Sequence, residues 1–114
     1  MPIYKAPIED TMFVLYDVLK MEAYGNLPGF ADAPRDLVEA IVNEGAKFCE
    51  EVLQPLNVVG DTVGCRRNAD GTVTTPPGFK EAYKQYQEGG WMGLAFDPEY
   101  GGQGLPATVN TVVG

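Results

Sequence analysis

The sequence predicts an all-α fold: a small helical bundle with a loop or short hairpin insertion, truncated at its C-terminal end. Apolar residues recur at helical spacing in three separate stretches, which indicates amphipathic helices. Most of the 14 glycines and 9 prolines fall between those stretches, where such residues end helices. Hydrophobic residues make up 45% of the 114 residues, which is enough to build a packed core.

The first predicted helix covers residues 7–21. Its N-cap is Asp10, or else Pro7 occupies the first helical position. The apolar residues at helical spacing are Ile8, Met12, Leu15 and Leu19. A linker rich in glycine, proline and asparagine follows over residues 23–34, and we expect it to be extended.

The second predicted helix is the strongest and runs from Arg35 to about Asp61. One apolar row consists of Leu37, Ile41, Phe48, Val52 and Leu56, and its neighbour of Val38, Val42, Cys49 and Leu53. Pro55 is expected to bend or interrupt this helix near Leu53, because the proline ring clashes with the preceding turn.

A turn sequence, Asn68-Ala69-Asp70-Gly71, separates β-prone flanks and predicts a short hairpin or a loop. Thr75 is then expected to cap a third helix with prolines in its first turn, and Gly89-Gly90 to end it. The apolar row of this helix, expected to lie in the core, is Phe79, Tyr83 and Tyr86, with Ala82 alongside.

The last part of the chain contains a glycine-rich turn over residues 97–106, followed by a new helix that contains Val109, Val112 and Val113. The sequence ends within the first two turns of that helix. We therefore expect its apolar face to be incompletely buried and the chain to be a piece of something longer.

The charge balance narrows the range of functions. With 8 basic and 16 acidic side chains the net charge is −8, which disfavours nucleic acids and anionic membrane surfaces as partners. The chain contains neither histidine nor serine, so a Ser-His-Asp triad is impossible. Cys49 and Cys65 alone cannot form a tetrahedral zinc site.

The location of the protein is expected to be cytoplasmic. The opening Met1 to Lys5 has no apolar core of signal-peptide length, and the longest apolar run, Met12 to Tyr16, is too short to span a membrane. Cys49 and Cys65 could form one disulfide, but nothing in the sequence indicates an oxidising compartment, so reduced thiols are the default.

The run Gly90–Leu94 followed by Pro98–Pro106 resembles the signature that closes the N-terminal helical domain of flavin-dependent acyl-CoA dehydrogenases. The helix over residues 35–55 is similar to the family's helix upstream of this signature. The opening segment resembles an extension carried by a subgroup, the 3-methylmercaptopropionyl-CoA dehydrogenase type; the residues that carry this resemblance are Tyr4–Pro7, Asp10, Phe13–Leu15, Val18 and Leu19. Residues 64–79 resemble a loop of that subgroup. The resemblance divides the chain into an extension helix and linker, 1–34, and an incomplete helical domain, 35–114.

The resemblance implies a parent enzyme that performs α,β-dehydrogenation of acyl-CoA thioesters. In the family, FAD lies between a β-rich middle domain and a helical C-terminal domain, and a glutamate of the C-terminal part removes the α-proton. Neither the flavin site nor the base lies in this chain, so it is expected to be inactive alone and to bind no FAD. The implied partners are the remaining domains, the acyl-CoA substrate, an electron-transfer flavoprotein and further copies of the chain in a homo-oligomer.

No residue is predicted to be catalytic, cofactor-binding or metal-binding. The spacing of Gly101–Gly104 differs from the dinucleotide fingerprint G-x-G-x-x-G, so a structural turn is favoured over a phosphate cradle. Glu50 and Glu51 are predicted to be solvated on the polar face of a helix. Asp97, near Glu99, is interpreted as a turn or cap residue.

Trp91, with Phe96 and Tyr100 nearby, could stack on a flavin or adenine, but packing in the core or between domains is favoured. Trp91, Tyr100, Gly101 and Gly102 are expected to shape a domain interface. Cys49 is interpreted as a small buried hydrophobe. The reactivity of Cys65, which is followed by Arg66 and Arg67, stays open.

The alternative is a stand-alone acidic helical module that binds a partner protein. Its contact surface would be apolar residues left by Met12, Phe13 and Tyr16, or the C-terminal valines. With such a surface exposed, the isolated chain is expected to oligomerise or to swap elements between copies.

Overall fold

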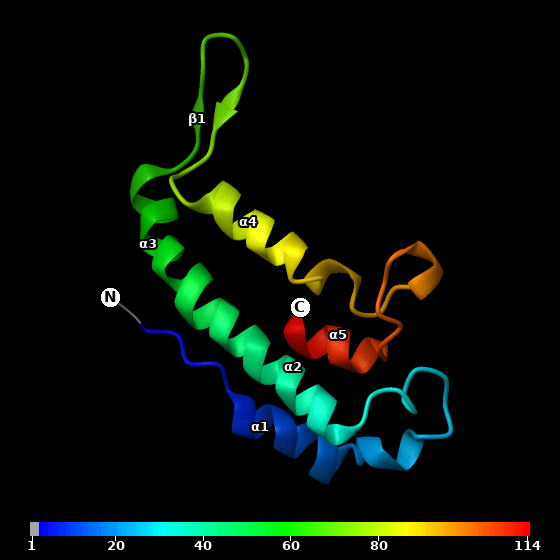
Figure 1. The fold of residues 1–114 in the computed structure, drawn as a ribbon. Coiled ribbons are helices and arrows are strands. Elements are labelled where there is room, and N and C mark those ends of the chain that lie inside the picture. Colours follow the sequence, from blue (N-terminus) through cyan, green and yellow to red (C-terminus); the bar gives the residue numbers. More distant parts are fainter. Residues whose placement is uncertain (1–2) are drawn as a thin grey trace.

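The computed structural model describes residues 3–114, so Met1 and Pro2 of the opening segment lie outside it. The all-α prediction is confirmed: helices form the body, and a short hairpin projects from one end (Figure 1). The first half contains α1 (Ile8–Phe13), η1 (Val14–Val18), η2 (Met21–Tyr24), α2 (Arg35–Phe48), η3 (Cys49–Leu53) and α3 (Gln54–Val63). The second half contains β1 (Arg66–Arg67), β2 (Val73–Thr74), α4 (Phe79–Glu88), η4 (Trp91–Gly93), η5 (Pro98–Tyr100) and α5 (Ala107–Val113).

Helices α2 and α3 form one long rod that is joined by the π-helical turn η3 (Figure 1). In this turn the Gln54 N–H donates to the carbonyl of Cys49, five residues back. Pro55 follows directly. Because proline has no N–H and its ring clashes with a regular preceding turn, the wider π turn accommodates it without breaking the rod. The helix thus departs from regular α geometry near Leu53, as predicted, but as a local widening and not as an interruption.

The core joins the N-terminal segment to the rest of the chain. Its buried residues are Leu15, Tyr16, Met21, Ala33, Val38, Val42, Leu94, Leu105 and Val109. On α2 the buried row is Val38, Val42 and Ala46, against which α1 and α5 pack. The expected rows are thus partly wrong, because Leu37 and Leu53 are exposed.

The first helix starts at Ile8, with Pro7 before it and Asp10 inside the first turn, so Asp10 is not the cap. The π-helical turn η1 then shifts the helical phase. The buried pair is Leu15 and Tyr16, whereas Leu19, expected on the buried face, is 50% exposed. The prediction that Leu19 is buried assumed a regular α-helix. The wider π turn rotates the residues that follow it, so Leu19 lies on the exposed side.

Tyr16 links the N-terminal segment to the start of α2. The guanidinium of Arg35 lies 4.7 Å from the centroid of the Tyr16 ring, an attractive cation–π geometry. Burial, with the nearby carboxylate of Glu22 as a smaller cause, raises the pKa of the Tyr16 hydroxyl. Tyr16 is consequently a structural residue of the core and not an open contact surface.

The predicted short hairpin is confirmed. Strands β1 and β2 pair antiparallel, with Arg66 opposite Thr74 and Arg67 opposite Val73. The tip is held by side chains: the Asn68 Nδ2 donates to the Thr72 and Thr74 hydroxyls, at 3.0 and 2.9 Å. The hairpin extends beyond the ends of α3 and α4 (Figure 1).

Asp70 makes the hairpin tip sensitive to pH. Its carboxylate accepts the Thr72 hydroxyl at 2.6 Å and the Thr72 N–H at 2.9 Å, and these bonds hold the pKa of Asp70 below its ordinary value of 3.8. The stabilisation of the hairpin tip by these two bonds is fully present above the ordinary pKa of an aspartate. It is lost as the pH falls through the lowered pKa that Asp70 has in the folded chain. An NMR titration of the Asp70 carboxyl should show Thr72→Val raising its pKa toward the ordinary value. An unchanged midpoint in that variant would contradict this assignment.

Helix α4 starts later than expected. Thr75 and Pro76 each precede a proline, which disfavours the helical region, and Gly78 adopts a left-handed φ of 88° just before the helix starts at Phe79. Thr75 is therefore not the cap. The predicted end at Gly89-Gly90 is confirmed, since α4 ends at Glu88.

The apolar face of helix α5 is incompletely buried, as expected. Val109 is fully buried, whereas Val112 and Val113 are only partly buried where they pack against the core. The end of α5 packs beside Gly45 of α2, where a Cβ would lie at ordinary contact distance, 3.8 Å from Val113 and 3.6 Å from the Trp91 ring. A transmembrane helix is absent from residues 3–114, since none of the helices combines the necessary length and apolarity.

Candidate functional site

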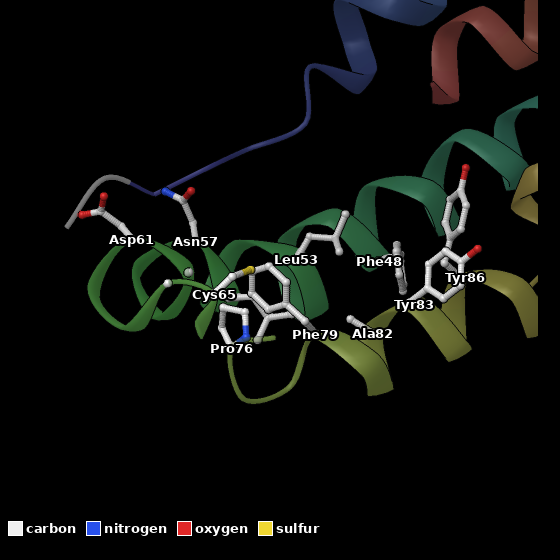
Figure 2. Close-up of a pocket in the computed structure, with 13 residues that line it drawn as sticks. Phe48, Leu53, Asn57, Asp61, Cys65, Pro76, Phe79, Ala82, Tyr83 and Tyr86 are labelled. Atoms are coloured by element: carbon white, nitrogen blue, oxygen red, sulfur yellow. The ribbon is translucent and has the colours of Figure 1, made fainter. Parts of the chain in front are cut away.

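An apolar groove lies between the rod, at η3 and α3, and helix α4 (Figure 2). Its volume is about 740 Å³. The residues that line it are Phe48, Leu53, Leu56, Asn57, Gly60, Asp61, Gly64, Cys65, Pro76, Phe79, Ala82, Tyr83 and Tyr86. We call this concavity the aromatic groove, because four of these side chains are phenylalanine or tyrosine.

The two walls of the aromatic groove touch at each end. At one end the rings of Phe48 and Tyr86 lie 6.2 Å apart between centroids. At the other end Phe79 lies over Gly60, where a Cβ would come within 2.8 Å of the ring. Between these contacts the walls stand open, and Tyr83 is 54% exposed.

This arrangement corrects the prediction that Phe79, Tyr83 and Tyr86 are core residues. Their spacing identified an apolar face of α4 correctly, but the facing wall covers only part of it. The feature of the sequence that could have indicated an open site is the pair Tyr83 and Tyr86. A tyrosine combines an apolar ring with a polar hydroxyl, so it suits a surface that is partly in contact with water.

The aromatic groove offers mainly apolar side chains for contact. Of the residues that line it, Asp61 is the only carboxylate and Cys65 the only thiol. General acid–base catalysis needs a proton-transfer group positioned at the reacting atoms, and no second carboxylate or cationic side chain lines this surface. The groove is therefore suited to binding an apolar surface.

The glycine-rich loop is a structural turn, as predicted. The N–H groups of residues 101–104 all donate to backbone carbonyls of the same region. Their acceptors are, in order, the carbonyl oxygens of Pro98, Asp97, Gly93 and Phe96, at 3.1, 3.1, 2.9 and 2.9 Å. A phosphate cradle needs free N–H groups that converge on the ligand, so this loop does not fit the pyrophosphate of FAD.

Asp97 caps η5, as predicted: its carboxylate accepts the Glu99 N–H at 2.8 Å. Glu51 is exposed, also as predicted. Glu50 is different, because it is half-buried and its Oε1 accepts the backbone N–H of Ala6 at 2.9 Å. The carboxylate thereby attaches the N-terminal segment to η3, a contact that helical periodicity alone does not reveal.

Glu50→Ala is expected to free the backbone around Ala6. A hydrogen bond to a charged acceptor is worth about 1.5 kcal/mol, which corresponds to about tenfold faster hydrogen exchange at the Ala6 amide. Glu51→Ala, one residue away and exposed, is the matched control and should leave that amide unchanged. Equal exchange rates in the two variants would show that Glu50 does not hold the segment.

The packing interpretation of Trp91 is confirmed, since the side chain is half-buried against the core beside Gly45 and Gly89. Phe96 and Tyr100 lie on the surface, and Tyr100 is 83% exposed. Cys49 and Cys65 are both free thiols. Cys49 is half-buried instead of fully buried as expected, and Cys65 is exposed.

Residues 3–114 contain no cluster of three or more cysteine, aspartate or glutamate side chains placed to hold a metal ion. No model of a protein family matches the chain. The chain is 36% identical over 106 residues to 3-methylmercaptopropionyl-CoA dehydrogenase of Ruegeria pomeroyi. The match covers 93% of this chain and 18% of the relative, so the chain spans less than a fifth of that protein's length. The resemblance to 3-methylmercaptopropionyl-CoA dehydrogenase that the sequence motifs indicated is thus confirmed: the chain is similar to one segment of that enzyme.

Proposed function

We propose that this chain is the N-terminal helical part of an FAD-dependent acyl-CoA dehydrogenase whose full-length form performs α,β-dehydrogenation of acyl-CoA thioesters. The observation that carries the proposal is the 36% identity to 3-methylmercaptopropionyl-CoA dehydrogenase across 93% of the chain. In this proposal residues 1–34 are the N-terminal extension and residues 35–114 belong to the helical domain. The parent is a cytoplasmic enzyme that passes electrons to an electron-transfer flavoprotein.

The role proposed for this chain is to form a wall of the enzyme. We assign it no catalytic, cofactor-binding or metal-binding residue, and we expect it to be inactive and free of FAD when isolated. The engaged N–H groups of residues 101–104 support this assignment. Trp91, Tyr100, Gly101 and Gly102 are proposed to shape the interface with the remaining domains, and the exposure of the Tyr100 ring supports such a contact.

The alternative, a stand-alone interaction module, has less support. Two parts of its expected contact surface are in the core, because Tyr16 and Val109 are buried. The apolar residues left exposed on the N-terminal helix are Phe13, Val14, Val18 and Leu19. We propose that this patch contributes to self-association of the isolated chain, and sedimentation of a concentration-independent monomer would overturn that statement.

The function is tested by a chimera in which this chain replaces the matched segment of the Ruegeria pomeroyi enzyme. Bound flavin is measured by absorbance, and dehydrogenation of 3-methylmercaptopropionyl-CoA by reduction of a dye acceptor. We expect the chimera to hold flavin and to turn over, and the isolated chain to do neither. A chimera that folds without flavin and activity would overturn the proposal, as would a native gene product of only 114 residues, measured by intact mass.

A further inference from the structure

We infer that the aromatic groove is the seat of an α-helix that continues the chain beyond α5 in the full-length protein. This inference rests on the proposed function, because it requires a parent longer than the 114 residues. One wall of the seat is formed by the rod, on which Figure 2 shows Phe48 and Leu53, and the other by α4. Leu56 of the rod also lines the groove. No residue of the described chain fills the space between the two walls.

The shape of the groove fits a helix. Both walls are themselves helical, and the rod contributes lining residues from Phe48 to Asp61. The stretch from Phe48 to Gly60, where the two walls touch at each end, extends about 18 Å, enough for about three turns of an occupant that lies over both walls along the rod. An occupant of that form would cover the groove in the helix-in-groove mode of recognition.

The surface chemistry demands an apolar face on that helix. Leu53, Phe79 and Tyr83 are exposed large side chains on the two walls, and each square ångström of apolar surface that is covered contributes about 25 cal/mol. Asp61 is the only ionised side chain of the lining, and it lies at the hairpin end. Away from Asp61 and Asn57 the walls are mostly apolar, so a charged or strongly polar segment would lose solvation along most of the groove.

The course of α5 supports a helix of the same polypeptide as the occupant. Its start lies beside Gly29, where a Cβ would be 3.7 Å from the Pro106 nitrogen, and its end lies beside Gly45. Helix α5 therefore runs in the same direction as the rod. One turn beyond Gly45 comes Phe48, the first residue of the groove. In the relative, 100 − 18 = 82% of the length lies outside the matched part, ample chain for another helix.

The test compares two positions on the rod with matched exposure. Leu53 is 43% exposed and lines the groove, whereas Val58 is 41% exposed and does not. Each is replaced by cysteine in the chimera, in a background with Cys49→Ala and Cys65→Ala, and the rate of maleimide labelling is measured. We expect the cysteine at position 53 to react at least tenfold more slowly than the cysteine at position 58. Tyr83→Cys against Lys84→Cys repeats the comparison on α4, in case either rod variant fails to fold.

Equal labelling rates at the paired positions would overturn the inference. Protection of position 53 that disappears on dilution would also overturn it, because a second copy would then be the occupant. A chimera that is active but unprotected refutes the helix seat and leaves the proposed function standing. A chimera without flavin or activity refutes the proposed function instead, so the two failures are distinguishable.

Discussion

Gly102→Ala is expected to lower the free energy of unfolding by about 3 kcal/mol, because a Cβ at this position collides with the backbone carbonyl of Phe96. The loop cannot relax easily. The N–H groups of Gly101 and Gln103, the residues on either side of Gly102, are bonded to the carbonyls of Pro98 and Gly93, which fixes the backbone on both sides. Urea unfolding followed by far-UV circular dichroism measures the loss.

Gly101→Ala is the matched control. Gly101 has a left-handed φ of 88°, but a Cβ there meets open space. The cost is then only the backbone strain of a non-glycine residue, about 1 kcal/mol. If the two variants were equally destabilised, the close approach of residue 102 to Phe96 would not be the determining feature of the loop.

Val109→Asp is expected to prevent folding. Val109 is fully buried in the core, and a carboxylate placed there must either lose its hydration or take up a proton. The expected loss is more than about 4 kcal/mol, which approaches the total stability of many small domains. Circular dichroism and the dispersion of amide NMR signals at 25 °C are the measurements.

Val58→Asp is the control for this prediction, because Val58 is a partly exposed valine on the outside of the rod. It should leave the chain folded and cost less than about 1 kcal/mol. A folded Val109→Asp variant with native helix content would mean that α5 is not docked in solution. Val109→Ala should give an intermediate loss of about 2 kcal/mol, the cost of removing two buried methyl groups.

Local signals in the sequence identified most elements of the fold. The spacing of Val38 and Val42 predicts α2, Asn68–Gly71 predicts the hairpin turn, and Gly89-Gly90 predicts the end of α4. These features depend on neighbouring residues, so a local pattern contains them. The π-helical turn η1 was not predicted. It holds one residue more than a regular helical turn and so rotates the side chains that follow it, yet the apolar residues of this segment recur at intervals that also fit an ordinary α-helix.

Features that depend on distant segments were not predictable in the same way. Val109 is buried in a core that also contains residues of the N-terminal segment and of α2, and the bond from Ala6 to Glu50 joins positions that are 44 residues apart. The aromatic groove shows the same limit at the candidate site. Periodicity identifies which face of α4 is apolar, but it contains no information on whether another element covers that face.

The π-helical turn η3 has a consequence for how sequences of this kind can vary in length. Removing one exposed residue from the turn, such as Glu51, would restore regular α-helical geometry and rotate α3 by about 100° relative to α2. That rotation would withdraw Leu56 from Gly78 and Gly60 from Phe79, the two contacts that align α3 with α4. Related sequences that lack this residue are therefore expected to differ also at the contact positions Leu56, Gly60, Gly78 or Phe79, because the altered direction of α3 needs a different packing against α4.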